Sequence, residues 1–322
     1  MKYTQLGRSG LSVSRLCLGT MNFGPVTPEP DAHRIMDVAL ENGVNFFDTA
    51  NDYGRHTGKG RTEEIIGDWF RSGGGRREKT VLATKLYAPI GEWPNDGKLS
   101  ALNIRNSLDA SLRRLKTDHV DLIQFHHIDR STPWDEIWQA IDVAVMQGKV
   151  IYTGSSNFAA WHIAMAQETA LRRQACGLVC DQSFYNLFTR DIEQEIIPAL
   201  RHYGMGLIPW SPLNQGLLGG ILRKEPGHRR LEGRAAAALA THRAQIEQYE
   251  ALADKIGQHP AEIALAWLLS RPVVTAPIVG PRTLEQLTSA LRAIDLALDQ
   301  ETLNELDWIF PPRKEAPEAF AW

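Results

Sequence analysis

The stretch Phe46-Phe47-Asp48-Thr49-Ala50-Asn51-Asp52-Tyr53-Gly54 joins a short apolar run to polar and turn-forming residues. Its first part is typical of the end of a buried strand, which needs no charge at that point. A connecting loop likewise needs no tyrosine five positions beyond an aspartate. Two later stretches, at residues 81–85 and 120–126, also consist of a short apolar run that leads to an ionisable residue. The repeated pattern predicts that functional side chains lie at the ends of successive strands.

Short apolar runs alternate with segments of helical periodicity along most of the chain. We expect strands at residues 16–20, 45–48, 81–85, 120–125, 150–153, 178–181, 206–210 and 275–279. We expect helices at residues 31–42, around 65–70, at 100–115, from 133 onward, and at 161–173, 191–203 and 284–293. Eight strand-then-helix units predict a parallel sheet closed into a (β/α)8 barrel, the TIM barrel, rather than a doubly wound sheet.

Several segments fall outside this repeat. Residues 2–13 hold two short extended pieces, which predict an N-terminal hairpin that plugs the barrel. A long loop follows the seventh strand from Ser211 to about Arg230, and helical patterns return at residues 235–256 and 261–269. A C-terminal helix is expected at 301–310, with a tail at 311–322. No interdomain linker is visible, so we expect a single domain over residues 1–322.

Individual residues predict the ends of some of these elements. Asp31 and Ser100 are expected to cap the starts of their helices, and Pro133 is expected at the first position of another. Pro209 and Pro277 lie inside predicted strands, where proline removes a hydrogen-bond donor, and we place both near the strand ends.

Composition limits the possible partners and compartment. The 322 residues are 43% hydrophobic and carry a formal net charge of −3. A slightly negative net charge does not favour binding to a nucleic acid. No apolar segment is long enough for a leader or a membrane span. The three cysteines are sparse and odd in number, so we expect a cytoplasmic protein with no disulfide framework and no metal site, and with Cys176 and Cys180 buried and inert.

Three ionisable residues stand at the ends of consecutive predicted strands. Asp48 ends the second strand, Lys85 ends the third, and His126 follows the fourth. The active sites of such barrels lie at the carboxyl ends of the strands, and neighbouring strands are about 4.8 Å apart. Lys85 can therefore reach Asp48 and approach His126. Tyr53, on the loop after the second strand, can fold back over all three.

This set suggests a proton donor. A neighbouring ammonium lowers the pKa of a phenol, so Lys85 is expected to make Tyr53 more acidic while Asp48 holds Lys85 in place. His126 can orient a substrate oxygen. Proton donation to an oxygen that gains negative charge is what carbonyl reduction needs, provided that a cofactor supplies hydride.

The chain resembles the aldo-keto reductases. The matching residues, in the order of the family, are Phe47 to Ala50 with Tyr53-Gly54, Ala83-Thr84-Lys85, Asp121 to His126, Gly154 with Ser156-Asn157-Phe158, Gln182 with Tyr185-Asn186, Trp210 to Leu213, and Gly280 with Arg282 and Gln286. The resemblance implies a (β/α)8 fold, NADPH bound without a Rossmann fingerprint, and reduction of aldehydes or ketones. It also implies Tyr53 as the acid, supported by Asp48, Lys85 and His126.

The resemblance further implies a set of cofactor-binding residues. These are Gly19, Thr20, Met21, Asp48, Ser156, Asn157, Gln182, Trp210, Ser211, Pro212, Leu213, Gly216, Leu217, Gly280, Arg282 and Gln286. Ser156, Asn157 and Gln182 are similar to the residues that bind the nicotinamide carboxamide, and Trp210 to the aromatic residue on which that ring stacks. Ser211, Leu213, Gly216 and Leu217 resemble the loop over the pyrophosphate. Arg282 is similar to the residue that pairs with the ribose 2′-phosphate, and it favours NADPH. Members often carry Glu-Asn where this chain has Ser289-Ala290, which leaves the preference for NADPH over NADH open. Tyr53, Tyr87, Trp93, His126 and Phe158 are candidates for the substrate pocket.

Other interpretations stay open at this point. Asp48 and Lys85 can be a structural ion pair at the barrel rim, and His126 an ordinary rim histidine. A cofactor-binding regulatory subunit with little turnover, similar to the potassium-channel β-subunits, is an alternative to a reductase. A (β/α)8 enzyme of metal or phosphate chemistry is a third hypothesis. The particular carbonyl substrate, the oligomeric state and the role of the tail cannot be read from the residues.

Overall fold

Eight parallel strands form one curled sheet in the computed structural model, which describes residues 1–224 and 233–321. Along the sheet the order is β10 (Ile278–Val279), β3 (Cys17–Gly19), β4 (Phe46–Asp48), β5 (Val81–Leu86), β6 (Val120–Phe125), β7 (Val150–Ser156), β8 (Leu178–Gln182) and β9 (Gly206–Leu207). Apart from β10, which lies beside β3, the strands follow chain order. The predicted (β/α)8 barrel is therefore confirmed.

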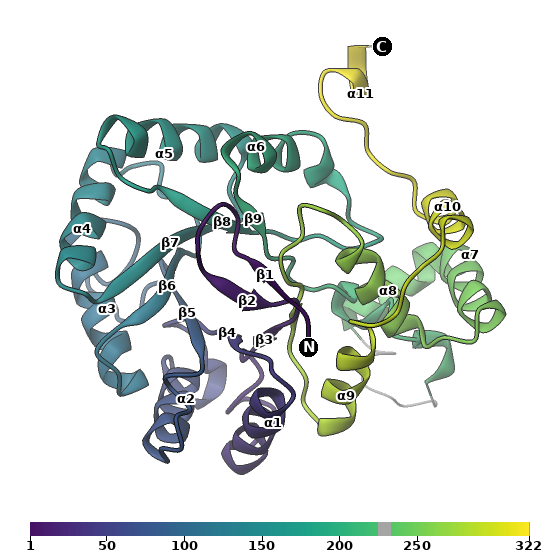
Figure 1. Cartoon of the computed structure of the whole chain (residues 1–322), viewed down its shortest axis with the longest axis horizontal. Coiled ribbons are helices and arrows are strands. Elements are labelled where there is room, and N and C mark those ends of the chain that lie inside the picture. Colours follow the sequence, from purple (N-terminus) through teal and green to yellow (C-terminus); the bar gives the residue numbers. More distant parts are fainter. Residues whose placement is uncertain (225–232, 322) are drawn as a thin grey trace.

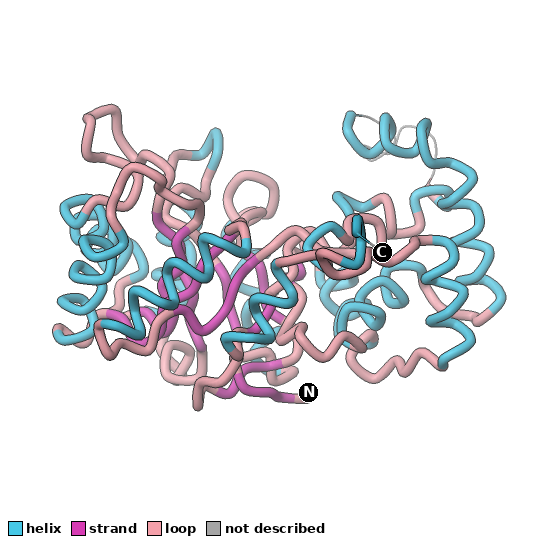
Figure 2. Tube along the Cα trace, turned by 90° about the horizontal axis from the view of Figure 1, so that it is seen from above, coloured by secondary structure: helices cyan, strands magenta, loops and turns pink. Residues whose placement is uncertain are grey.

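Helices connect these strands and cover the outside of the sheet (Figure 1). They are α1 (Glu29–Glu41), α2 (Arg61–Arg71), α3 (Ala101–Leu115), α4 (Trp134–Met146), α5 (Ala160–Arg172), α6 (Ile196–Tyr203), α8 (Pro260–Leu269) and α9 (Leu284–Arg292). Two helices lie outside the repeat: α7 (Gly233–Lys255) packs against α8, and α10 (Gln300–Ile309) packs against α7. Figure 2 shows this helical region beside the strands. No helix of the described chain is both long and apolar enough to cross a bilayer.

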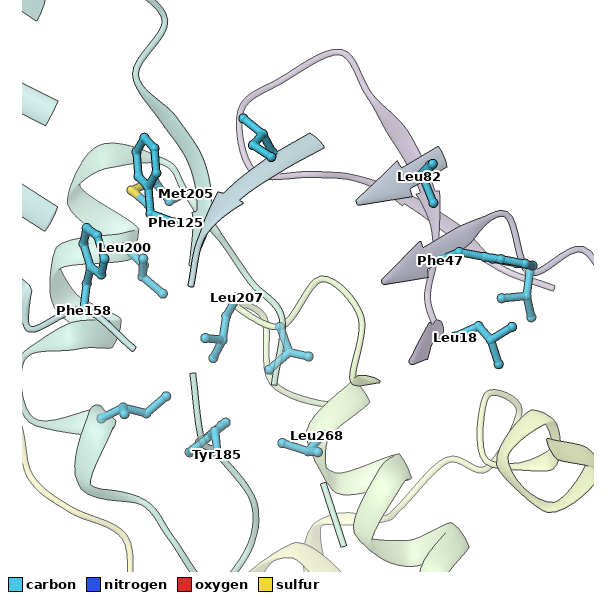
Figure 3. Close-up of a cluster of buried hydrophobic side chains, with 14 of the residues drawn as sticks. Leu18, Phe47, Leu82, Phe125, Phe158, Tyr185, Leu200, Met205, Leu207 and Leu268 are labelled. Carbon is cyan, nitrogen blue, oxygen red and sulfur yellow. The ribbon is translucent and has the colours of Figure 1, made fainter. Parts of the chain in front are cut away.

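Successive residues of each strand face opposite sides of the sheet, and this alternation creates two apolar layers. Leu18, Phe47 and Leu82, labelled in Figure 3, point outward and share an apolar cluster with residues of the surrounding helices. Their neighbours Cys17, Phe46 and Ala83 point into the barrel. Because the alternation has a period of two, the next inward positions, toward the carboxyl ends of the strands, are occupied by Asp48 and Lys85. Strand geometry thus delivers both charged groups to the barrel interior.

The N-terminal hairpin closes the other end of the barrel, as predicted. Strands β1 (Tyr3–Gln5) and β2 (Ser12–Ser14) pair antiparallel. Leu6 and Val13 of this hairpin pack with Phe46 and Ile208 in the inner apolar cluster. Charged groups deeper in the barrel are consequently separated from solvent at this end.

The sheet closes through a seam of irregular backbone. β9 and β10 are two residues each, shorter than the predicted strands at 206–210 and 275–279, and both prolines lie just outside them. The seam is held by hydrogen bonds from the Leu207 amide to the Val273 carbonyl (3.0 Å), from Thr275 to Leu207 (2.8 Å) and from Ile278 to Pro209 (2.8 Å). A proline cannot donate to a ladder, which explains why the regular strands are so short here.

Some predicted element boundaries were wrong by a few residues. Helix α1 begins two positions before Asp31, which lies in the first turn rather than at the cap, because Pro28 occupies the cap. Pro133 is likewise the cap of α4 and not its first residue. Ser100 caps α3 as predicted, accepting a hydrogen bond from the Asn103 amide. Cys176 is exposed, contrary to expectation, whereas Cys17 and Cys180 are buried.

The remaining segments differ in smaller ways. Residues 191–203 split into a short 3-10 turn, η2 (Asp191–Glu193), and α6. The loop after β9 contains two more such turns, η3 (Asn214–Gly216) and η4 (Ile221–Arg223), and the part of it at residues 225–232 lies outside the described chain. The C-terminal tail is mostly irregular but forms a short helix, α11 (Glu318–Ala321), which projects from the body in Figure 1.

Candidate active site

Lys85 lies at the centre of a buried polar cluster at the carboxyl ends of the strands. Its side chain is 0% exposed, and its ammonium donates to Asp48 Oδ2 (2.5 Å), to the Thr49 carbonyl (2.9 Å) and to Tyr53 Oη (3.1 Å). An ammonium has three protons, so each proton of Lys85 has its own acceptor. Since Tyr53 Oη accepts from Lys85, its own hydroxyl proton is free to point elsewhere. The arrangement presents a phenol as a donor.

Burial and the charges of this cluster shift the pKa values of Lys85 and Tyr53. Burial alone would lower the pKa of Lys85, but Asp48 and Tyr53 outweigh it and raise that pKa, so Lys85 stays an ammonium. Burial also raises the pKa of Tyr53, and Lys85 opposes this shift without cancelling it. The expectation that Lys85 makes Tyr53 more acidic than a free tyrosine was therefore wrong in its net direction. The sequence showed the cation, but not the burial that outweighs it.

Two amide side chains hold Asp48 from the opposite side. Its Oδ1 accepts hydrogen bonds from Gln124 Nε2 and from Gln182 Nε2, both at 2.9 Å. Gln182 Nε2 also lies 3.1 Å from Gln124 Oε1. Asp48 is 3% exposed, so this frame compensates a carboxylate that has lost its water. Gln124 was not assigned a role from the sequence, although it alternates with Leu122 on the inward face of β6.

His126 completes the predicted group. It follows β6, and its ring packs edge-on against Tyr53, with ring centroids 5.9 Å apart. On its other side it stacks on His127 at 5.3 Å. Its Nδ1 faces Asp52 Oδ1 at 3.6 Å. The structure thus brings Asp48, Tyr53, Lys85 and His126 together at one end of the barrel.

The residues that the resemblance assigned to a nicotinamide form a connected chain next to this group. Ser156 Oγ donates to the Gln182 carbonyl (2.9 Å), and Asn157 Nδ2 donates to Ser156 Oγ (2.9 Å). Asn157 Oδ1 accepts from Trp210 Nε1 (2.9 Å), and Phe184 stacks on the indole at 4.5 Å. Asn157 has a φ of +59°, in the left-handed region that asparagine tolerates better than most residues. This backbone conformation places the Asn157 side-chain amide between Ser156 Oγ and Trp210 Nε1.

Two other rim segments lie together on the far side of the group. Thr20 Oγ1 donates to the Asp48 carbonyl (2.9 Å), so the loop after β3 is joined to the end of β4. In the same loop, Asn22 Nδ2 donates to the Gly280 carbonyl (2.9 Å) after β10. Gly19 ends β3 where a Cβ would lie 2.5 Å from Ile278, and Met21 is exposed at the rim.

The loop after β9 is more closed than its predicted phosphate-binding role suggested. Ser211, Asn214, Gln215 and Gly216 all have positive φ. Even so, the amides of residues 214–218 are hydrogen-bonded inside the loop, and Pro212, Gly216 and Leu217 are buried with Leu213 partly exposed. The backbone amides that would cradle a phosphate are thus already engaged here.

The start of α9 carries the remaining predicted cofactor residues. Gln286 Oε1 accepts from the Arg282 amide (2.9 Å), and Thr283 caps the helix. Ser289 donates to Glu262 on α8 (2.9 Å), and Ala290 is buried in an apolar cluster. The two positions that depart from the family pattern therefore serve the packing of α8 against α9.

The aromatic pocket candidates are not gathered in one place. Tyr87 packs edge-on against His127, with centroids 5.4 Å apart, near the site. Trp93 is 81% exposed. Phe158 is 1% exposed and packs against Trp134, so it belongs to the outer apolar layer beneath the helices. Among these three, Tyr87 is the ring that the structure places beside the histidines.

Two acidic residues near the site were not assigned a role from the sequence. Asp52 directly precedes Tyr53 and faces His126. Asp181, on the outward face of β8, accepts from Ser155 Oγ (2.6 Å) and Ser183 Oγ (2.5 Å) next to the nicotinamide candidates. No spacing in the sequence singles out either residue, because His126 and Ser155 come from other parts of the barrel and a serine two positions after an aspartate is common.

Comparison with known proteins identifies the family of the chain. The Aldo/keto reductase family model matches residues 15–310. The chain is 54% identical over 329 residues to the Bacillus subtilis protein named uncharacterized oxidoreductase YrpG, with all of both chains covered. It is 33% identical over 332 residues to a probable voltage-gated potassium channel subunit beta of Arabidopsis thaliana, covering 99% of this chain and 100% of the relative. It is 32% identical over 346 residues to versiconal hemiacetal acetate reductase of Aspergillus parasiticus, covering 98% and 99%. The chain belongs to the aldo/keto reductase family.

Proposed function

We propose that this protein is an NADPH-dependent oxidoreductase that reduces aldehydes or ketones to alcohols. The observation that carries the proposal is the contact between Lys85 Nζ and Tyr53 Oη in a buried cluster with Asp48. A phenol whose oxygen accepts from a permanent cation can give up its proton more readily than an equally buried phenol without one. General acids of this kind act on an oxygen that gains negative charge.

Each residue of the group has a separate part in this chemistry. Tyr53 donates its proton to the carbonyl oxygen of the substrate. Lys85 stabilises the phenolate that is left, and Asp48 keeps Lys85 charged in a site where burial favours the neutral amine. His126, whose ring packs against Tyr53, donates a hydrogen bond that orients the same oxygen. NADPH, when bound, supplies the hydride.

The donor set beside Gln182 fits a nicotinamide carboxamide. Among the described residues nothing donates to Gln182 Oε1, whereas its Nε2 is engaged with Asp48. Asn157 Nδ2 uses one proton on Ser156 and has a second available. An acceptor beside a donor complements a primary carboxamide. Trp210, with Phe184 on one face, offers the other face to a flat ring.

The rest of the cofactor is proposed to lie along the rim. The residues that would hold it are Gly19, Thr20, Met21, Ser211, Pro212, Leu213, Gly216, Leu217, Gly280, Arg282 and Gln286. Because the amides of residues 214–218 are engaged within their loop, we expect side chains, with Arg282 first, to carry most of the phosphate recognition. A guanidinium suits a 2′-phosphate, so NADPH is proposed over NADH.

Replacement of Tyr53 by phenylalanine tests the proposal. Tyr53→Phe removes the proton donor and keeps the ring, so kcat for aldehyde reduction should fall by about 10²–10⁴-fold. NADPH affinity should not change. The assay follows NADPH consumption with a panel of aldehydes, and a binding titration follows the cofactor. Tyr203→Phe is the matched control, since its hydroxyl contacts Glu168 on the outside of the barrel. Wild-type turnover by Tyr53→Phe would show that another group is the acid.

The relationship to a channel subunit supports a second candidate function, a cofactor-binding regulatory subunit. Such a protein would hold NADPH tightly and turn it over slowly. A single-turnover experiment separates the two functions. An enzyme oxidises bound NADPH rapidly and releases product, whereas a regulatory subunit does so slowly with every aldehyde of the panel and co-purifies with a partner protein.

The cellular setting is also a proposal. Three free cysteines, two of them buried, suit a reducing compartment, and we propose the cytoplasm. The proposed partner is a small carbonyl compound rather than a nucleic acid or a membrane.

A further inference from the structure

The carboxylate of Asp52 faces Nδ1 of His126, the buried nitrogen of that ring. Asp52 lies in the loop after β4, one position before Tyr53, and its Oδ1 is 3.6 Å from His126 Nδ1. The side chains are 27% and 16% exposed, respectively. The contact therefore joins two of the loops that carry the proposed catalytic group.

Both facing atoms are closed off from solvent and lack a hydrogen-bond partner within the described chain. Buried polar atoms without partners are rare in folded proteins, and each calls for an explanation. At 3.6 Å the two atoms are slightly too far apart for a hydrogen bond, and a small rotation of either side chain would form one. His126 Nε2 is not among the sealed atoms, so it is the ring nitrogen available to a substrate.

The charges around His126 favour a proton on Nδ1. Burial acts to raise the pKa of Asp52, but the interaction with His126 outweighs it and keeps that pKa below its usual value, so Asp52 is ionised. Within the described chain, the other titratable groups that pack directly against the ring are Tyr53 and the stacked His127, and Lys85 lies behind Tyr53 with its ammonium on the phenol oxygen. Burial, and after it the neighbouring His126, lowers the pKa of His127, so His127 is the neutral ring of the stacked pair at neutral pH.

We propose that Asp52 is a positioning residue that keeps a proton on Nδ1 of His126, so that Nε2 can donate to a substrate oxygen only when the ring is an imidazolium. A histidine has one N–H when neutral, and the group facing its other nitrogen decides where that proton sits. With the proton held at Nδ1, neutral His126 offers Nε2 only as an acceptor. The inference rests on the proposed function, in which His126 orients the carbonyl oxygen.

Asp52→Asn is the informative variant because it keeps the shape and removes the charge. The side-chain amide that it introduces can donate to Nδ1, which permits a neutral ring with its proton on Nε2. In the wild type, kcat/KM for an aldehyde should be about tenfold lower at alkaline pH than at acidic pH, the size expected for losing a hydrogen bond from a charged donor. In Asp52→Asn this fall should largely disappear.

Two further variants make the test specific. His126→Gln offers an amide donor that does not titrate, so adding Asp52→Asn to it should change kcat/KM no further. Asp118→Asn is the matched control, because Asp118 contacts His119 at 2.6 Å in an exposed pair at the opposite end of β6. It should keep the wild-type pH profile. A wild-type profile in Asp52→Asn, or an equal effect of that change in the His126→Gln background, would overturn the proposal.

A measurement without turnover separates this inference from the proposed function. Nitrogen-15 NMR of histidine-labelled protein reports which ring nitrogen carries the proton. In the wild type, Nδ1 of His126 should stay protonated across the pH range while Nε2 titrates, and in Asp52→Asn the neutral ring should carry its proton on Nε2. A neutral wild-type ring protonated on Nε2 would overturn the inference even if the protein reduces aldehydes. The expected pattern would uphold the placement of the proton even if no aldehyde were a substrate.

Discussion

Asp181 is a buried carboxyl group without a cation beside it in the described chain. It is 0% exposed, and its partners are the hydroxyls of Ser155 and Ser183 and the amide of Phe158. Burial raises its pKa to about 6, although these hydrogen bonds oppose the shift. Ser155 and Phe158 flank the Ser156-Asn157 pair, so this group fixes the backbone that presents the proposed carboxamide site.

The raised pKa of Asp181 predicts a pH-dependent stability. The folded protein holds this proton more tightly than the unfolded chain, so stability is lost as the pH rises from about 4 through about 6. The loss is at most about 3 kcal/mol, since one pKa unit corresponds to about 1.4 kcal/mol. Asp181→Asn has no charge to bury and resembles the protonated acid, because its oxygen can accept from one serine hydroxyl while its amide donates to the other. Urea denaturation should show it gaining stability over the wild type at pH 8 and not at pH 4, and an equal difference at both values would contradict the explanation.

At the scale of residues, the sequence predicted which groups meet but not what burial does to them. Asp48 and Lys85 could be found because both end strands and share the inward face. The net pKa shift of Tyr53 could not, because it depends on how completely the folded chain removes water from the phenol. The partners of Asp52 and Gln124 come from other strands or loops, and their contacts exist only after the barrel closes.

At the scale of elements, Glu63 of α2 ties three of them together. It is 0% exposed, and its two carboxylate oxygens accept from Thr84 Oγ1 on β5 (2.6 Å) and from Arg114 Nε on α3 (2.8 Å). Thr84 directly precedes Lys85 and faces the opposite side of the strand. This outer contact therefore holds the strand that carries the central lysine on the inside.

Removal of Glu63 should destabilise the protein strongly. Glu63→Ala leaves the Arg114 guanidinium without its buried carboxylate, which typically costs about 3–5 kcal/mol. Glu64→Ala is the matched control, since the neighbouring Glu64 forms a half-exposed pair with Arg61, and such pairs contribute about 1 kcal/mol or less. Denaturant midpoints measure both. A loss of similar size in the two variants would show that the buried pair stabilises the fold no more than the half-exposed pair does.

The elements themselves were largely predictable because their patterns are local. The apolar stripe of Ile65, Ile66, Trp69 and Phe70 is buried in α2, and the Ser100 cap forms as predicted. Several of the errors occur at prolines. Pro28 displaces Asp31 from the cap of α1, and the two prolines near the seam shorten β9 and β10, because a missing amide affects pairing with a neighbour that the local pattern does not reveal.

At the scale of the whole molecule, the order of the eight strands could be predicted from alternation alone, because successive parallel strands usually lie side by side. The position of α7 and α10 could not, since both interrupt or follow the repeat and carry weak or ambiguous patterns. The position of the C-terminal tail could not be predicted from the sequence either. The tail docks on η2 through polar contacts, including the Arg313 amide with Glu193 Oε2 at 2.8 Å.

The seam between β9 and β10 has a consequence for how the molecule comes apart. A circular sheet has no free edge from which a strand can peel, so opening must begin at its thinnest join. Native-state hydrogen exchange should find the amides of Leu207, Thr275 and Ile278 exchanging before those of β5 to β7. Equal protection around the circle would show that the join is as firm as the rest. If it does loosen first, transient opening would occur beside Trp210, and the central lysine on β5 would be among the last groups to meet water.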